Sequence, residues 1–121
     1  HGSTFGGNCL TNAAAVATLE VLSDGKTLPR AREAAARLRA GLDALQKKHP
    51  DQIEQVRGMG LLLGVVLKDP ERAKAVAAAA LEHGLLLNVT ADRVLRIAPP
   101  LVVTDAQIDE GLAILGRVFA S

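Results

Sequence analysis

The chain has 121 residues, enough for one domain with a substantial buried core, and its 49% hydrophobic and 22% charged residues exclude a disordered protein. The 14 basic and 13 acidic residues are interspersed and leave a net charge of +1, so we expect neither nucleic acid nor a membrane as a partner. No apolar run approaches the roughly 18 to 20 residues of a membrane-spanning helix, and the single cysteine, Cys9, suits a reducing cytoplasm.

The first predicted helix covers Cys9–Leu22 and follows a glycine-rich segment, residues 1–8. Asn8 can cap this helix, and Ser23-Asp24-Gly25 can end it. The helix is apolar nearly all round, and such helices are normally buried on several sides. One small domain offers too few partners for it, and the chain opens on a specialised loop without an initiator methionine. We therefore interpret the chain as part of a longer protein.

A second, amphipathic helix is predicted from Thr27 to the residue before Pro50. Its inner stripe recurs at helical spacing and consists of Ala31, Ala35, Leu38, Leu42 and Leu45. Its basic residues lie largely on the other faces and are expected to be solvated: Arg30, Arg32, Arg37, Arg39 and Lys47.

Two short apolar runs follow, Ile53–Val56 and Leu61–Leu67, and both are typical of strands. The intervening Arg57-Gly58-Met59-Gly60 predicts a turn or a bulge between them. A third helix is predicted to open at Asp69 and to end at Gly84, with alanines on its packing face.

The last third of the chain predicts two more strands, Leu85–Val89 and Val94–Ala98. Thr104 and Gln107 have the spacing of a capping box for a final helix, whose inner face carries Ile108, Leu112, Leu115 and Phe119. The order helix, helix, strand, strand, helix, strand, strand, helix favours an α+β fold, in which a small, mainly antiparallel sheet has helices packed on one face.

The glycine-rich segment Gly2–Asn8 is a candidate anion site. Ser3 and Thr4 offer two hydroxyls, the glycines permit close approach of backbone N–H groups, and a helix N-terminus follows. A plain turn is the alternative, because glycine-rich segments are common in turns.

Arg96 is the second candidate, because strand alternation places it with Val94 and Ala98 on one face of an apolar strand. A guanidinium there needs a partner, since an unpaired buried charge is strongly destabilising. Three alternatives stay open: a structural ion pair, an edge position that reaches solvent, and two-pronged recognition of a substrate carboxylate.

Three blocks span nearly the whole chain: His1–Asn8 (HGSTFGGN), Val56–Gly64 (VRGMGLLLG), and Leu85–Thr90 (LLLNVT) followed by Leu95–Leu101 (LRIAPPL). In this order they resemble segments of the class-III, fold-type I aminotransferases, which depend on pyridoxal phosphate. The last block resembles the acetylornithine and ornithine branch of that family in particular.

The resemblance implies roles for three residues. Ser3 and Thr4 match the pair that reaches across a homodimer interface to the phosphate of the second copy's pyridoxal phosphate. Arg96 matches the arginine that holds the α-carboxylate of the substrate. The resemblance also implies that residues 1–25 belong to the large domain and the interface, and that residues 26–121 form the C-terminal small domain of the fold-type I enzymes.

The resemblance does not supply a catalytic residue. In the family, the lysine that links to the cofactor lies before the first block, and none of the lysines here matches its motif: Lys26, Lys47, Lys48, Lys68 and Lys74. We therefore expect the chain to be inactive alone. Cys9 stands where the family usually has proline, and we interpret it as a small helix residue. The histidines lack metal-ligand spacing, so no metal site is predicted.

The parent enzyme implied by the resemblance moves the δ-amino group of N-acetylornithine, or of a related ω-amine, to 2-oxoglutarate. It would do so in arginine biosynthesis, as a cytoplasmic homodimer. Two alternatives stay open: an ornithine or 4-aminobutyrate aminotransferase, and a non-catalytic module that self-associates.

Overall fold

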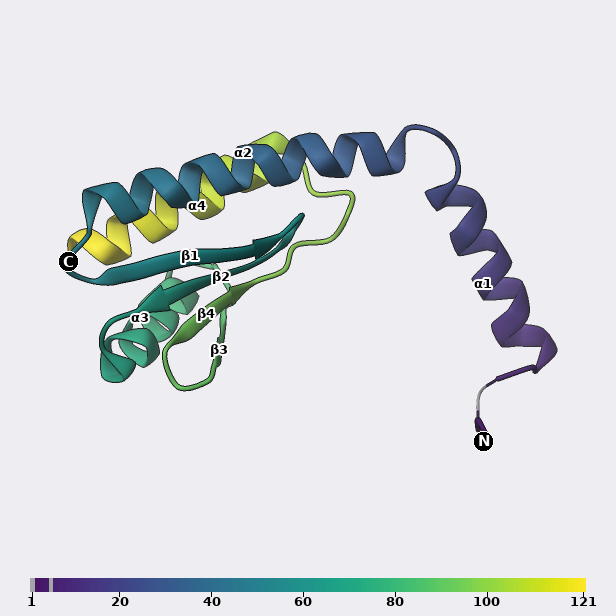
Figure 1. Ribbon diagram of the computed structural model, residues 1–121, viewed down its shortest axis with the longest axis horizontal. Coiled ribbons are helices and arrows are strands. Elements are labelled where there is room, and N and C mark those ends of the chain that lie inside the picture. The colour runs from purple at the N-terminus through teal and green to yellow at the C-terminus, as the bar shows by residue number, and fades with distance from the viewer. Residues whose placement is uncertain (1, 5) are drawn as a thin grey trace.

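The computed structural model describes residues 2–4 and 6–121 (Figure 1). His1 and Phe5, which belong to the first sequence block, lie outside the described residues. The elements follow the predicted order: α1 (Cys9–Leu22), α2 (Thr27–Lys48), β1 (Ile53–Met59), β2 (Leu62–Leu67), α3 (Pro70–Glu82), β3 (Asn88–Thr90), β4 (Val94–Ile97) and α4 (Asp105–Ala120). The predicted α+β fold is confirmed.

The sheet has the strand order β1-β2-β4-β3, and each neighbouring pair is antiparallel. One hydrophobic core joins side chains of α2, α3 and α4 to the strand residues that face them, among them Leu63, Val65 and Leu95. Val66 and Val94 are buried as well but do not belong to this core, because strand alternation places them on the opposite face. We call that opposite side the open face of the sheet.

The hairpin of β1 and β2 extends further than the sequence predicts. The predicted strand Ile53–Val56 is too short, since β1 runs to Met59 and the turn consists of Gly60 and Leu61. Gly58 has φ +120°, and a Cβ at this position would lie 2.2 Å from the carbonyl oxygen of Leu62. Only glycine therefore lets β1 continue alongside β2 here.

The predicted strand Leu85–Val89 is wrong at its start, because β3 covers only Asn88–Thr90. Leu85 instead ends α3: its N–H donates to the carbonyl of Ala80 at 2.8 Å, while Gly84, with φ +85°, donates to Leu81 at 2.9 Å. This is a Schellman ending, and it commits the backbone of Leu85 to the helix rather than to the sheet.

The predicted helix caps are confirmed. The Asn8 side chain accepts from the Thr11 N–H, and Thr104 and Gln107 form a capping box at the start of α4. The N-cap residue of α2, Lys26, makes no side-chain cap bond. Before it, the Asp24 carboxylate accepts from the backbone N–H groups of Lys26 and Thr27, both at 2.7 Å, which the sequence did not reveal. These two bonds, with a third from the Thr27 hydroxyl, lower the pKa of Asp24.

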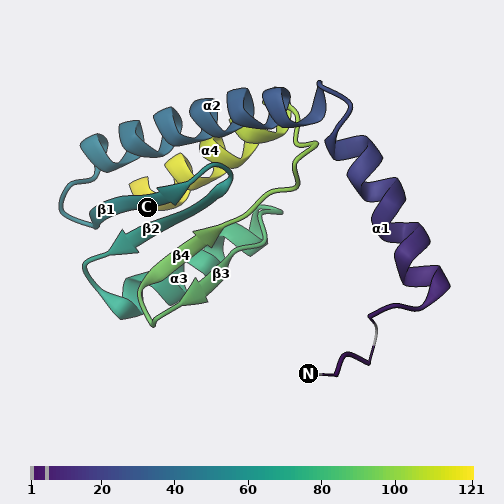
Figure 2. The same cartoon turned by 45° about the vertical axis from the view of Figure 1, so that its right-hand side comes forward.

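Some basic residues of α2 form ion pairs, although the sequence predicts that they are solvated. Arg30 forms an ion pair with Asp105 at 2.7 Å, and Arg37 donates two hydrogen bonds, of 2.8 and 2.6 Å, to the carboxylate of Asp109. Both pairs join α2 to α4, which lie side by side in Figures 1 and 2. Residues more than 70 positions apart in the sequence are thereby connected.

Helix α1 stands apart from this body. None of its residues is buried, and it extends away from the sheet in both views (Figures 1 and 2). Cys9, in its first turn, is exposed as well. Across the described residues, none of the helices combines the length and the apolar character that crossing a membrane requires.

Candidate functional site

Arg96 lies on the open face, at the centre of a row that crosses all four strands. The register aligns Arg57 of β1 with Gly64 of β2, Gly64 with Arg96 of β4, and Arg96 with Asn88 of β3. Residues aligned in this way share a face. The row therefore places Arg57 and Arg96 on either side of Gly64, and Asn88 beyond Arg96. Leu95, the neighbour of Arg96, is fully buried in the core on the other side.

The guanidinium of Arg96 is exposed and has no ion pair or hydrogen bond among the described residues. Four other arginines do have carboxylate partners: Arg30, Arg37, Arg39 and Arg93. Strand β4 is also an interior strand of the sheet. The described residues therefore contain no structural ion pair for Arg96. The side chain does reach solvent, but from an interior strand and not from an edge, and recognition of a substrate carboxylate stays a prediction.

A hollow of about 450 Å³ adjoins Arg96. Its lining consists of Leu86, Leu87, Asn88, Arg96 and Ala98. A cation and an amide thus lie beside aliphatic side chains, an arrangement that suits a small ligand with a carboxylate and an aliphatic chain.

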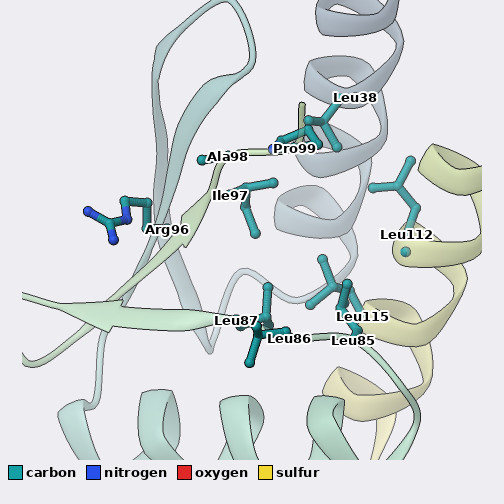
Figure 3. A pocket seen from close by; sticks show the side chains of 11 residues that line it. Leu38, Leu85, Leu86, Leu87, Arg96, Ile97, Ala98, Pro99, Leu112 and Leu115 are labelled. Atoms are coloured by element: carbon teal, nitrogen blue, oxygen red, sulfur yellow. The ribbon is translucent and has the colours of Figure 1, made fainter. Parts of the chain in front are cut away.

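A second cavity, of about 240 Å³, lies on the helix side of β4. Figure 3 shows the side chains of Ile97, Leu112 and Leu115 converging there, whereas the Arg96 side chain points away from them. Arg96 is among the residues that line this cavity, but its side chain extends away from the apolar ones, and the open face is the side on which its guanidinium can meet a ligand.

The other predicted site, the loop with Ser3 and Thr4, is compact. The Ser3 Oγ accepts from the N–H of Gly6 at 2.9 Å, and a Cβ at Gly6 would lie 2.8 Å from the same oxygen. Gly7 follows with φ +82°. A side chain at Gly6 would therefore crowd Ser3, and the backbone conformation of Gly7 favours glycine.

This loop has the groups that a phosphate needs. Thr4 is exposed, and its hydroxyl has no hydrogen-bond partner among residues 2–4 and 6–121. The N-terminus of α1 follows directly, with the partial positive charge and the backbone N–H groups of a helix start. The residues present therefore fit the phosphate of a cofactor. In the same described ranges, no group of three or more His, Cys, Asp or Glu side chains could hold a metal ion.

The structure does not bring the two predicted sites together within one chain. Figures 1 and 2 both place the loop at the far end of α1, away from the sheet that carries Arg96.

Sequence reasoning missed Asn88 and Arg57, the partners of Arg96 in the row. Asn88 directly follows three leucines in the block LLLNVT, which is a signal that could have been found. That it lies opposite Arg96 depends on the register of β3 with β4, which local sequence does not determine.

Comparison with known proteins gives one consistent family. The model of the class-III aminotransferases matches residues 1–119. The acetylornithine aminotransferase of Mycobacterium leprae is 49% identical over 98% of this chain and 28% of its own length. The ornithine aminotransferase of Saccharomyces cerevisiae is 42% identical over 97% of this chain and 28% of its own length.

Solved structures agree. The acetylornithine aminotransferase from Elizabethkingia anophelis superposes with a TM-score of 0.87 at 38% identity, over 99% of this chain and 32% of that one. An ornithine aminotransferase from Toxoplasma gondii, crystallised with partial occupancy of PLP at its active site, superposes with a TM-score of 0.83 at 37% identity, over 98% of this chain and 28% of that one.

The chain spans 28 to 30% of the length of curated relatives such as these. Over that span the sequence blocks, the α+β fold and the superpositions agree with the family model. The chain belongs to the class-III aminotransferases.

Proposed function

We propose that the complete enzyme containing this chain transfers the δ-amino group of N-acetylornithine, or of a related ω-amine, to 2-oxoglutarate. We place it in the cytoplasm, in arginine biosynthesis, as a homodimer with pyridoxal phosphate. The observation that carries the proposal is Arg96, an exposed guanidinium with no partner among the described residues, beside a hollow with an aliphatic lining. Donor and acceptor each carry an α-carboxylate, for which this group is suited.

The relatives favour N-acetylornithine as the amino donor without excluding ornithine. Acetylornithine aminotransferases of Mycobacterium leprae and Gloeobacter violaceus are 49% and 44% identical to the chain, and the ornithine aminotransferase of Saccharomyces cerevisiae is 42% identical. Ornithine is therefore the second candidate donor. The two differ only in the group on the α-nitrogen, so the choice depends on what surrounds the α-carbon.

The chain's own residues would act at two places, the loop before α1 and the sheet. The Thr4 hydroxyl would donate to the cofactor phosphate, and Ser3 would keep the loop closed through its bond from Gly6. Arg96 would hold the α-carboxylate with two parallel hydrogen bonds and so orient the substrate. When bound, the cofactor supplies the electron sink for amino transfer.

We further propose that residues 1–25 belong to the large domain and the dimer interface, and that residues 26–121 form the small domain. The absence of buried residues in α1 supports this division, because an apolar helix is stable in water only against a partner surface. We assign the chain no catalytic lysine and expect no turnover from it alone. A non-catalytic, self-associating module is the alternative for the isolated chain.

Arg96→Lys in the complete enzyme tests the function. Lysine keeps the charge and loses the planar fork, so the variant should fold but lose roughly 1.5 to 3 kcal/mol of binding in the transition state, or about 10- to 150-fold in kcat/KM. Both N-acetylornithine and 2-oxoglutarate should be affected. The kcat/KM value for an amine that lacks the α-carboxylate should fall little. If kcat/KM falls equally with and without the carboxylate, Arg96 does not hold it.

A further inference from the structure

The cavity on the helix side of β4 marks a place where the hydrophobic core is incomplete. Four aliphatic residues pack against the core and yet are only half-buried, and all four line this cavity: Leu85, Leu87, Ile97 and Leu112. Figure 3 shows their side chains around a common space. The cavity, of about 240 Å³, is bounded by α2, by the segment before β3, by β4 and by α4.

Gly111 of α4 adds to this space because it has no side chain. A Cβ at this position would lie 3.8 Å from the Cδ1 atom of Leu85, which is an ordinary van der Waals contact. No close approach therefore requires glycine here. A larger residue at position 111 would project toward Leu85 and narrow the cavity, because both residues line it.

The cavity offers no side-chain partner to a polar group. Among the lining residues that the structure describes, Arg96 alone has a polar side chain, and it extends away from the apolar ones (Figure 3). Burial of an unpaired hydroxyl or amide is unfavourable, whereas a dry cavity of roughly 150 Å³ with an aliphatic and aromatic lining holds benzene. The lining and the volume thus fit an uncharged hydrocarbon group of about six to eight carbon atoms.

This cavity and the hollow beside Arg96 have a common wall. Both spaces are lined by the same four residues: Leu86, Leu87, Arg96 and Ala98. Ile97, between two of them in the chain, points into the cavity, while Arg96 points away from it (Figure 3). A molecule in the cavity therefore contacts the strand that carries Arg96 from behind. It restrains that strand before an anion binds, so the anion has less to order, which gives positive cooperativity.

We propose that this cavity is a regulatory site for an uncharged apolar molecule, and that its occupancy strengthens carboxylate binding at Arg96. The regulation rests on the proposed function, because it takes Arg96 as a carboxylate-binding residue, whereas occupancy of the cavity does not. The alternative is that a side chain from outside this chain fills the cavity in the complete enzyme, in which case no small molecule enters.

Toluene is the probe for occupancy, and phenol, with a hydroxyl in place of the methyl group, is the matched polar compound. The protein is the complete enzyme with pyridoxal phosphate. An NMR titration should detect toluene binding, and phenol should bind at least about 10-fold more weakly, because its hydroxyl finds no side-chain partner in the cavity.

Gly111→Val places a side chain in the cavity and should weaken toluene binding by about 10-fold or more. Gly116→Val is the matched control on the same helix. A Cβ at Gly116 would lie 3.7 Å from the Cδ2 atom of Leu45, and Gly116 does not line the cavity, so toluene affinity should stay unchanged. Gly111→Ala is the smaller change and should weaken binding by about threefold, which keeps the test decisive if the valine variant does not fold.

Glutarate measures the regulation without turnover, because it has the two carboxylates of 2-oxoglutarate and lacks the oxo group that reacts. Saturating toluene should lower the dissociation constant of glutarate by about fivefold, the lower end of typical coupling between two sites. Glutarate should lower that of toluene by the same factor, since such coupling is reciprocal. Calorimetry measures both constants, and toluene should have no effect on glutarate binding in Gly111→Val.

The outcomes separate this inference from the proposed function. No toluene binding, equal binding of toluene and phenol, or equal toluene affinity of wild type and Gly111→Val overturns the site. Toluene binding that leaves glutarate affinity unchanged overturns the regulation. If Arg96→Lys leaves glutarate affinity unchanged, Arg96 does not bind the carboxylate and the proposed function loses its support, while toluene and phenol still test the cavity.

Discussion

Thr4 is the residue of the N-terminal loop whose hydroxyl has no partner among the described residues, whereas that of Ser3 is already bonded to Gly6. Thr4→Val keeps the shape and removes the donor. In the complete enzyme we expect the dissociation constant of pyridoxal phosphate to rise by roughly 10- to 150-fold, the range of a hydrogen bond to a charged group.

Thr18→Val is the control for this change, because Thr18 lies on α1 and its hydroxyl donates to the carbonyl of Ala14. It should leave cofactor affinity unchanged. Equilibrium dialysis against pyridoxal phosphate measures both variants. A Thr4→Val enzyme that retains wild-type affinity would remove Thr4 from the phosphate site and leave the loop as a plain turn.

The hairpin of β1 and β2 contains two glycines with positive φ that differ in their surroundings. At Gly58 a Cβ would lie 2.2 Å from Leu62 O and 2.9 Å from Leu63 Cα, both of them backbone atoms that cannot rotate away. At Gly60, with φ +58°, a Cβ would meet nothing within 4 Å. Gly58→Ala should therefore destabilise the chain by about 3 kcal/mol or more, and Gly60→Ala by about 1 to 2 kcal/mol.

Chemical denaturation of the two variants measures this difference. Because Gly58 lies in β1, next to the strand that carries Gly64, its substitution should also disturb the open face, whereas a substitution in the turn should not. Equal stabilities for the two variants would mean that the hairpin relaxes and that the close approach at Gly58 has no energetic consequence.

The pairing of α2 with α4 makes stability depend on pH. Two hydrogen bonds from Arg37 hold the pKa of Asp109 below the ordinary value of an aspartate, about 3.9. A lowered folded-state pKa contributes stability above the unfolded-state value and loses it as the pH falls through the folded-state value. The contribution should therefore be complete near neutral pH and disappear between about pH 4 and the lower pKa of the folded chain.

Asp109→Asn should be less stable than the wild type at neutral pH, and the difference should shrink as the pH falls below about 4. Arg37→Gln should show the same behaviour, and the double variant should add little to either single change. Unfolding by urea at a series of pH values makes the comparison. A difference that stays constant down to pH 2 would exclude the pair as its cause.

At the scale of the whole molecule, α1 exposes large apolar side chains and packs little against the rest. Leu19 is 61% exposed and Leu10 is 80% exposed. Such a surface rarely persists on a monomer, so we expect the 121-residue chain to self-associate through α1. Light scattering should find oligomers for the chain and a shift toward monomer for Leu19→Lys.

Leu81→Lys provides the control, since Leu81 is 59% exposed, almost the same as Leu19, but lies on α3. It should not change the state of association. A monomeric chain whose α1 amides are protected from hydrogen exchange would contradict the prediction, because the helix would then be stable in water without a partner.

The sequence by itself determined the elements and the family. Apolar spacing, glycines and caps are local signals, so the order of helices and strands, the start of α1 at Cys9 and the capping box at Thr104 could be predicted. The three sequence blocks likewise identified the class-III aminotransferases, which the family model matches over residues 1–119.

The tertiary structure alone decided which partners those residues have. Strand register brings Asn88, Gly64 and Arg57 into line with Arg96, and helix packing joins Arg37 to Asp109, 72 positions away. The Schellman ending of α3 took Leu85 away from β3. These outcomes depend on contacts between segments that are distant in the chain. A local pattern indicates which face a side chain occupies, but the residue beside it is determined only when the whole sheet and its helices pack together.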